Sequence, residues 1–229
     1  MHPNTHRLDL RLARLVKTDS LVPCQQATQR NFKTACQFSQ QIMLKHPYTS
    51  DFHSLAEHLH AGLLEGDCNV ISYVPQPYQL RLRGQRYKPD CYVAMQNGPR
   101  RVLELKPRGE FIDDKRIPLE HFFAEHGMTF EVVSNESVFD REIEARNWLE
   151  ILKILHIATT YDTQAAEEML LELFYQQNEH TVGDIVDSGD RERTYLSEIA
   201  LFRLLHRGHL KAALSEKWLN YDTEVTLCR

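Results

Sequence analysis

Residues 89–106 read PDCYVAMQNGPRRVLELK, and this stretch decides the fold that we expect. Two apolar runs flank the Asn-Gly dipeptide at 97–98, which is typical of a tight turn between antiparallel strands. Side chains alternate between the two faces of a strand, so Glu104 and Lys106 share one face. A hairpin with this turn can place Asp90 opposite Glu104. The stretch therefore predicts two carboxylates and one ammonium group that converge at a sheet edge.

Such a group of charges indicates metal-assisted chemistry. Neighbouring carboxylates repel each other, and a divalent cation removes that cost. Carboxylate oxygens suit Mg²⁺, with Mn²⁺ as a substitute, and a bound metal stabilises the charge that develops on a phosphodiester. Lys106 could orient the attacking water or neutralise the phosphate. A structural salt bridge from Lys106 to Asp90 or Glu104 is the alternative interpretation.

A third carboxylate, Glu57, precedes this hairpin. It lies in an apolar-periodic stretch, 51–65, that predicts a helix with Ser50 or Asp51 as its N-cap. Glu57 falls beside the leucine stripe of that helix and could reach the sheet edge as a further metal ligand. A solvated helix glutamate is the alternative.

The flanking patterns predict an α/β domain in which a helix, a strand meander, a helix, a strand and a helix follow one another. Leu103 and Leu105 should point into its core. Apart from the hairpin strands 91–95 and 101–106, the expected strands are 69–74, 78–83 and 128–134, and the further helices are 119–126 and 140–157.

A polar stretch at 159–163 suggests a domain boundary. Three helical patterns and a β-ribbon follow it, an order that is typical of a winged helix; they cover 165–177, 181–187 capped by Thr181, 195–207 closed by Gly208, and 209–227. We therefore expect an N-terminal helical extension, a nuclease domain and a winged-helix-like domain, at 1–50, 51–158 and 159–229.

Charge is unevenly distributed along the chain. The net charge is −5, yet residues 78–116 hold ten Lys and Arg against five Asp and Glu. This basic segment predicts phosphate contact, and the candidate DNA-binding residues are Arg81, Arg83, Arg86, Lys88 and Arg108. A solvated strand surface is the alternative.

Residues 156–229 hold seven basic and thirteen acidic residues. A winged helix of that charge should be repelled by a duplex, so we expect 160–229 to bind protein instead. The apolar positions available for docking are Leu214, Trp218, Leu219 and Tyr221, although Trp218 could equally pack in the domain's own core.

Composition fits a globular protein, with 42% apolar residues and no apolar run long enough for a membrane span. The first twenty residues lack the apolar core of a signal peptide. The five cysteines match no zinc-site spacing and are expected as free thiols in a reducing cytoplasm.

The chain resembles the TnsA family, the endonuclease subunits of heteromeric transposases, which have a restriction-endonuclease-like fold of the PD-(D/E)xK class. The similarity covers about residues 50–155, and the motifs that carry it are Ser54–Glu57, Val70, Tyr73, Gln76-Pro77, Arg86-Tyr87, Pro89-Asp90 and Glu104–Pro107.

The resemblance implies that Glu57, Asp90, Glu104 and Lys106 are catalytic, with the Leu105 carbonyl as an additional metal ligand. Some members carry Gln where this chain has Glu104. Gln76 is expected to be a structural residue that satisfies backbone groups at the end of the strand, not a catalytic one. The family implies cleavage of the non-transferred strand at the 5′ side of transposon ends, in the bacterial cytoplasm at the nucleoid. Its partners would be a TnsB-like DDE transposase and a TnsC-like AAA+ ATPase.

Two other functions are compatible with the sequence. One is a stand-alone restriction or repair nuclease with the same core, which should cut DNA without partners. The other is a non-catalytic adaptor on a degenerate nuclease scaffold, which should show no metal binding that depends on Asp90.

Overall fold

The computed structural model describes residues 8–28 and 37–228, and it has a mixed α/β architecture. The chain forms two compact units. The N-terminal unit comprises Met1–Gln41, Thr49–Glu57 and Asn69–Phe139, and the C-terminal unit comprises Ile42–Tyr48, His58–Cys68 and Asp140–Arg229. This division falls at 139/140 rather than at the boundary expected near 158, and short segments of the first half belong to the C-terminal unit.

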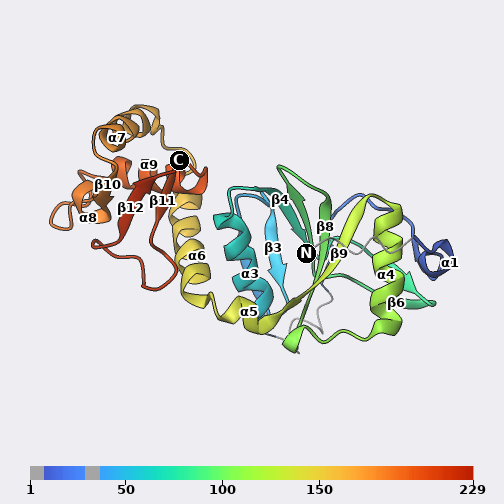
Figure 1. Ribbon diagram of the computed structural model, residues 1–229. Helices are drawn as coiled ribbons and strands as arrows, with labels where there is room; N and C mark the ends of the chain where they lie inside the picture. The colour runs from blue at the N-terminus through green and yellow to red at the C-terminus, as the bar shows by residue number, and fades with distance from the viewer. Residues whose placement is uncertain (1–7, 29–36, 229) are drawn as a thin grey trace. The chain divides into compact units, whose positions relative to one another are not determined.

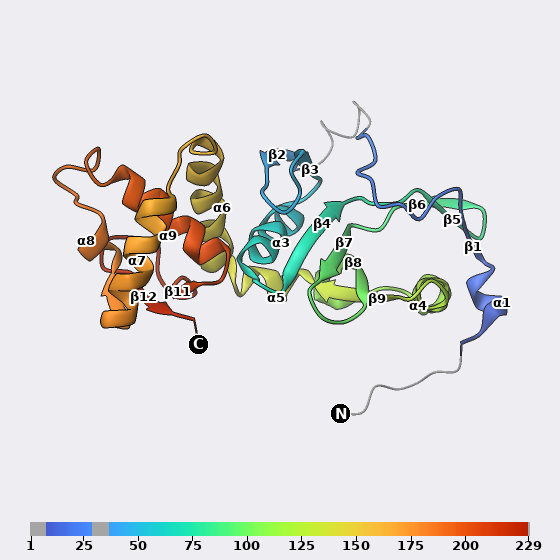
Figure 2. The same cartoon turned by 90° about the horizontal axis from the view of Figure 1, so that it is seen from above.

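A four-stranded sheet forms the centre of the N-terminal unit (Figure 2). Its order is β4-β7-β8-β9, where the strands are β4 (Val70–Pro75), β7 (Cys91–Met95), β8 (Arg100–Lys106) and β9 (Met128–Ser134). The first three strands are antiparallel neighbours, whereas β8 and β9 are parallel. All four were expected from the sequence, as was the turn between β7 and β8.

The parallel pair requires a crossover connection, and helix α4 supplies it. The chain leaves β8 through the 3₁₀ turn η1 (Pro107–Gly109) and continues into α4 (Asp113–Glu125). Helix α4 buries Leu119, Phe122 and Phe123 in a cluster that also contains Phe130 of β9. The expected helix at 119–126 is therefore real but begins earlier, at Asp113.

The same unit contains a second sheet, which includes one strand from the N-terminal part of the chain. Its strands are β1 (Val16–Thr18), β5 (Leu80–Leu82) and β6 (Gln85–Tyr87), in the order β1-β5-β6. Short helix α1 (Leu10–Ala13) precedes β1, and strands β2 (Ser39–Ile42) and β3 (Thr49–Phe52) pair with each other. The expected helical extension over 1–50 is thus wrong for the described residues, which form mainly strands and irregular segments.

Helix α3 (Leu55–Gly66) begins later than its apolar pattern indicated. Asp51 belongs to β3, and the cap is Ser54, whose Oγ accepts a hydrogen bond from the Glu57 amide at 3.2 Å. The Glu57 carboxylate in turn accepts from Ser54 Oγ at 2.9 Å and from the His53 amide at 3.1 Å. This arrangement is a variant of the capping box, and it fixes the side chain of Glu57 at the start of the helix.

The C-terminal unit contains helices and one three-stranded sheet (Figure 1). Following α5 (Asn135–Phe139) of the N-terminal unit, its elements are α6 (Glu142–Ile157), α7 (Gln164–Gln176), β10 (Glu179–Thr181), α8 (Val182–Ile185), α9 (Tyr195–His206), β11 (Leu210–Ala212) and β12 (Glu224–Leu227). The sheet order is β10-β12-β11, and α6, α7 and α9 share one apolar core.

Several expectations for this unit are confirmed. Helices α7, α8 and α9 lie where the sequence predicted them, and Thr181 caps α8 in a reciprocal capping box with Asp184. Gly208 follows α9 with a left-handed φ of 75°. The expected ribbon is β11 and β12, and strand β10 joins it as a third member that the sequence did not indicate.

None of the described helices combines the length and apolar character needed to cross a bilayer. Cys24, Cys91 and Cys228 are free thiols, as expected. The fifth cysteine, Cys36, lies outside the described residues.

Candidate functional site

The pairing of β7 with β8 places Asp90 beside Glu104. Cys91 pairs with Leu103 in an antiparallel register. Asp90, which precedes Cys91, therefore lies beside Glu104, which follows Leu103. The Asp90 amide donates to the Leu103 carbonyl at 3.1 Å, and the Leu105 amide donates to Asp90 Oδ2 at 2.7 Å. The hairpin geometry predicted from the sequence is therefore confirmed.

Glu104 and Lys106 share one face of β8, as strand alternation predicts. Lys106 Nζ lies 2.6 Å from Glu104 Oε1, and the Glu104 side chain is almost fully buried. Leu103 and Leu105 are buried as expected. A salt bridge from Lys106 to Glu104 was the alternative interpretation of the sequence, and this ion pair is present. Lys106 therefore neutralises one of the neighbouring carboxylates.

Tyr87 of β6 is a site residue that the sequence analysis missed. Its hydroxyl donates to Glu104 Oε2 at 2.5 Å, so the two oxygens of this carboxylate have different partners. Tyr87 is also in the Arg86-Tyr87 motif quoted above, but its three-residue strand was too short to reveal which way the side chain points. The hydroxyl fixes the orientation of Glu104.

Glu57 joins this group from helix α3. Its Oε2 accepts a hydrogen bond from Gln76 Nε2 at 2.7 Å, and Glu57 interacts electrostatically with Lys106 and Glu104. Asp90 feels the charges of both Glu104 and Glu57. Three carboxylates and one lysine therefore form a single cluster within the N-terminal unit. They come from α3, from the residue that precedes β7, and from β8.

Asp90 and Glu57 have raised pKa values because of this environment. Burial, followed by the charges of Glu104 and Glu57, raises the pKa of Asp90 well above its ordinary value. Burial also raises the pKa of Glu57, and hydrogen bonds from His53 and Ser54 only partly oppose it. Folding thus holds these groups where their ionised forms are unfavourable.

The same negative charges also raise the pKa values of Lys106 and Tyr87. Burial acts to lower the pKa of Lys106, but the neighbouring Asp90 and Glu104 outweigh it and raise the pKa overall. Burial and the Glu104 charge raise the pKa of Tyr87 well above its usual value, which keeps its hydroxyl protonated as a donor. One ammonium group therefore faces three carboxylates.

The donor set suits a divalent cation. As the side chains stand, no group of three or more His, Cys, Asp and Glu in the described part of the chain is arranged to hold a metal ion. The carboxylates are nevertheless hard oxygen ligands, and the repulsion that raises the pKa of Asp90 is the kind that a cation relieves. Asp90, Glu104 and Glu57 would hold such an ion; a role for the Leu105 carbonyl remains a prediction.

Three basic side chains form a row across the sheet β1-β5-β6. Lys17 pairs with Arg81, and Arg81 pairs with Arg86, so the residues lie directly opposite one another on adjacent strands. All three are exposed, and none has an acidic partner among the described residues. Like charges opposite each other destabilise a sheet, so this row favours an anionic partner.

The other predicted DNA-binding residues do not join this row. Arg83 is in an ion pair with Asp114 at 2.9 Å. Lys88 is half-buried, and its Nζ lies 3.5 Å from the Ala27 carbonyl. Arg108 is exposed on η1, where its amide donates to Glu136 Oε2 at 2.6 Å.

Comparison with known protein families and with curated proteins finds no match to this chain.

Replacing Asp90 by Asn tests the electrostatic cost of the cluster. The folded state binds more protons than the unfolded state wherever a carboxyl pKa is raised, so stability falls as the pH rises from the ordinary carboxyl pKa towards the raised one. Asn keeps an acceptor for the Leu105 amide but carries no charge. We expect Asp90→Asn to unfold at a higher temperature than the wild type at pH 8 in chelator, with the difference narrowing towards pH 4.

Asp114→Asn is the matched control, because Asp114 is exposed and its ion pair is at the surface. Parallel curves of unfolding temperature against pH for Asp90→Asn and the wild type would contradict a raised pKa at Asp90.

Proposed function

We propose that this chain is a metal-dependent DNA endonuclease that hydrolyses phosphodiester bonds. The proposal is carried by the charge cluster of Glu57, Asp90, Glu104 and Lys106. A purely structural salt bridge needs one carboxylate for Lys106, whereas here three carboxylates are gathered and two have raised pKa values. An excess of buried negative charge is better explained by a bound cation.

The order of elements supports a restriction-endonuclease-like core for the N-terminal unit. Helix α3 precedes the meander β4-β7-β8, and α4 then leads to the parallel strand β9. In the C-terminal unit, α7, β10, α8, α9, β11 and β12 follow one another, with β12 between β10 and β11. That order supports the winged-helix-like interpretation of this unit.

The chain's own residues would position the reacting groups. A divalent ion, when bound, would stabilise negative charge on the phosphate and acidify a coordinated water. Tyr87 and Lys106 hold the two oxygens of Glu104, and the Leu105 amide holds Asp90, so both carboxylates are fixed before substrate arrives. The Lys106 ammonium, kept protonated by its neighbours, is placed to stabilise charge on the phosphate.

The narrower assignment rests on the family resemblance. We propose that the substrate is the non-transferred strand at the 5′ side of transposon ends. A TnsB-like DDE transposase and a TnsC-like ATPase would be the partners of the chain.

Cleavage should require the metal and each of the central residues. Asp90→Ala should abolish Mn²⁺ binding, while Lys106→Ala should retain binding and still lower the rate of DNA cleavage by at least about 100-fold. Cleavage of end-labelled transposon-end DNA, with the partner proteins present and Mg²⁺ or Mn²⁺ added, measures this. Glu125→Ala, an exposed carboxylate at the end of α4, is the control. An Asp90→Ala protein that cuts at the wild-type rate would remove the basis for the proposal.

We propose that the row of Lys17, Arg81 and Arg86 contacts the DNA backbone. Strands in a sheet lie about 4.8 Å apart, so the row extends for roughly 10 Å across the exposed face. Phosphate contacts release counterions, which makes affinity fall with salt. Residues 156–229, in contrast, hold thirteen acidic and seven basic residues.

The double variant Arg81→Ala/Arg86→Ala should weaken duplex binding. It should also reduce the slope of log affinity against log salt by about two, since each lost phosphate contact removes roughly 0.9. Fluorescence anisotropy with labelled duplex over a salt series provides the measurement. The control is the double variant Lys153→Ala/Arg193→Ala in the C-terminal unit, which loses the same two positive charges. An unchanged affinity and slope would place the DNA surface elsewhere.

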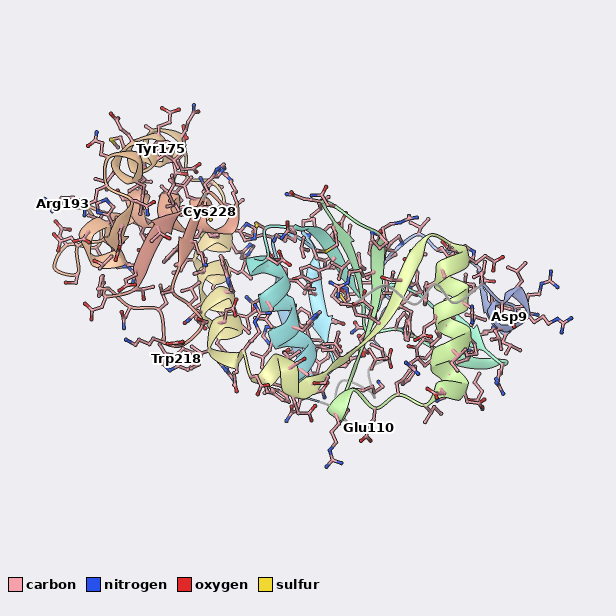
Figure 3. The ribbon with its side chains drawn as sticks, viewed as in Figure 1. Asp9, Glu110, Tyr175, Arg193, Trp218 and Cys228 are labelled. Carbon is pink, nitrogen blue, oxygen red and sulfur yellow. The ribbon has the colours of Figure 1, made fainter. Side chains whose placement is uncertain are left out.

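The C-terminal unit presents aromatic side chains for a protein partner. Trp218 is 56% exposed and Tyr221 is 41% exposed, so Trp218 does not pack fully in the core (Figure 3). Leu214, in contrast, is buried and belongs to the core of the unit. Exposed Trp and Tyr are the residue types most often found at binding hot spots.

Trp218→Ala/Tyr221→Ala should therefore weaken binding of the full-length chain to the TnsB-like or TnsC-like partner by at least about tenfold. Surface plasmon resonance with each purified partner measures the change. Tyr175→Ala, which removes an even more exposed aromatic side chain on α7, should have no effect. Equal affinities of the double variant and the wild type for both partners would exclude this surface.

A further inference from the structure

Gln76 lies at the end of β4 in an unusual backbone conformation. It is flanked by Pro75 and Pro77, is only 2% exposed, and has a φ of 40°. Left-handed backbone is uncommon for residues other than glycine and is often found at functional sites. The expectation from the sequence was that Gln76 only satisfies backbone groups at the end of the strand.

Main-chain hydrogen bonds hold Gln76 in this conformation from both sides. Its amide donates to the Asp90 carbonyl at 2.9 Å, and its carbonyl accepts from the Gln26 amide at 3.1 Å. The first of these bonds ties Gln76 to the residue whose side chain is central to the candidate site. The main chain of Gln76 therefore satisfies backbone groups of Asp90 and Gln26, as expected. These bonds do not explain why a glutamine side chain is buried at this position.

The side chain makes one contact and lacks another. Gln76 Nε2 donates to Glu57 Oε2 at 2.7 Å, while Gln76 Oε1 is buried and has no hydrogen-bond partner among the described residues. A carboxylate can only accept, which fixes the orientation of the carboxamide. Because both atoms belong to one planar group, the unpartnered oxygen lies next to Glu57.

A buried acceptor without a donor is unfavourable, and such groups in native proteins usually meet an ordered water or an ion. A purely structural glutamine here could be replaced by an apolar residue with little consequence for the site. The free oxygen beside a candidate catalytic carboxylate instead indicates a solvent molecule belonging to the site.

We propose that Gln76 is a positioning residue of the site, whose N–H₂ orients Glu57 and whose Oε1 accepts a hydrogen bond from a water bound beside it. The inference rests on the proposed function, because it assumes that the Glu57 cluster binds a divalent cation. In this role Gln76 acts through Glu57 and a coordinated water and does not contact the substrate.

Gln76→Met removes both hydrogen-bonding atoms while keeping a side chain of similar length. Loss of a hydrogen-bonding partner of a metal ligand typically costs 10- to 100-fold in metal affinity, and we expect a loss in this range. Electron paramagnetic resonance titration with Mn²⁺ alone, on the full-length chain, measures it without activity. Gln85→Met is the control, because Gln85 is exposed on β6. Thermal unfolding in chelator should differ little between the two variants.

A second measurement uses the wild-type chain and so avoids a folding failure of the variant. In ¹⁵N-labelled protein, the side-chain N–H₂ signals of Gln76 should shift when Mg²⁺ is added, and should not shift in Asp90→Asn. Signals of the Gln85 amide group should stay in place in both proteins.

The outcomes separate this inference from the proposed function. If the wild type binds Mn²⁺ in an Asp90-dependent manner, but Gln76→Met binds it equally well and the Gln76 signals do not move, then the role of Gln76 is overturned and the proposed function stands. If the wild type shows no Asp90-dependent Mn²⁺ binding, the proposed function fails first. Weaker binding by Gln76→Met with an unchanged unfolding temperature supports the positioning role.

Discussion

The site depends on one local interaction, the hydrogen bond from the Leu105 amide to the Asp90 carboxylate. Together with the bond from the Asp90 amide to Leu103, it fixes the register of β7 against β8. Strand side chains alternate with a period of two, so a slip of one residue would carry Glu104 and Lys106 to the opposite face. The register therefore decides whether these charges meet Asp90 and Glu57 at all.

The same arrangement makes the site electrostatically costly. Burial and mutual repulsion raise the pKa values of Asp90 and Glu57, and Lys106 is a single cation against three carboxylates. A fold selected only for stability would be expected to avoid this excess, since unpaired buried charge is strongly unfavourable. The surrounding groups keep each carboxylate in place. Tyr87 holds Glu104, and the Leu105 amide holds Asp90. Gln76 and Ser54 hold Glu57.

The sequence predicted what local patterns determine. The Asn-Gly turn and strand alternation placed Asp90 beside Glu104, and helical periodicity located α7 and α9. Strand β1 was missed because it pairs with β5, far along the chain, and three residues carry no detectable alternation. The roles of Gln76 and Tyr87 in the site were not predicted for a related reason. Their contacts, to Glu57 and Glu104, arise from tertiary packing, and no spacing in the sequence encodes the direction of either side chain.

We propose above all that the Asp90 cluster is a binding site for a divalent cation. Anomalous X-ray diffraction from crystals of the chain soaked in Mn²⁺ tests it most directly, because it locates the metal without reference to activity. We expect an anomalous peak within coordination distance of carboxylate oxygens of Asp90 and Glu104, and no such peak in crystals of Asp90→Asn. A wild-type map with Mn²⁺ bound elsewhere, or with Lys106 alone occupying the space between these carboxylates, would contradict the account.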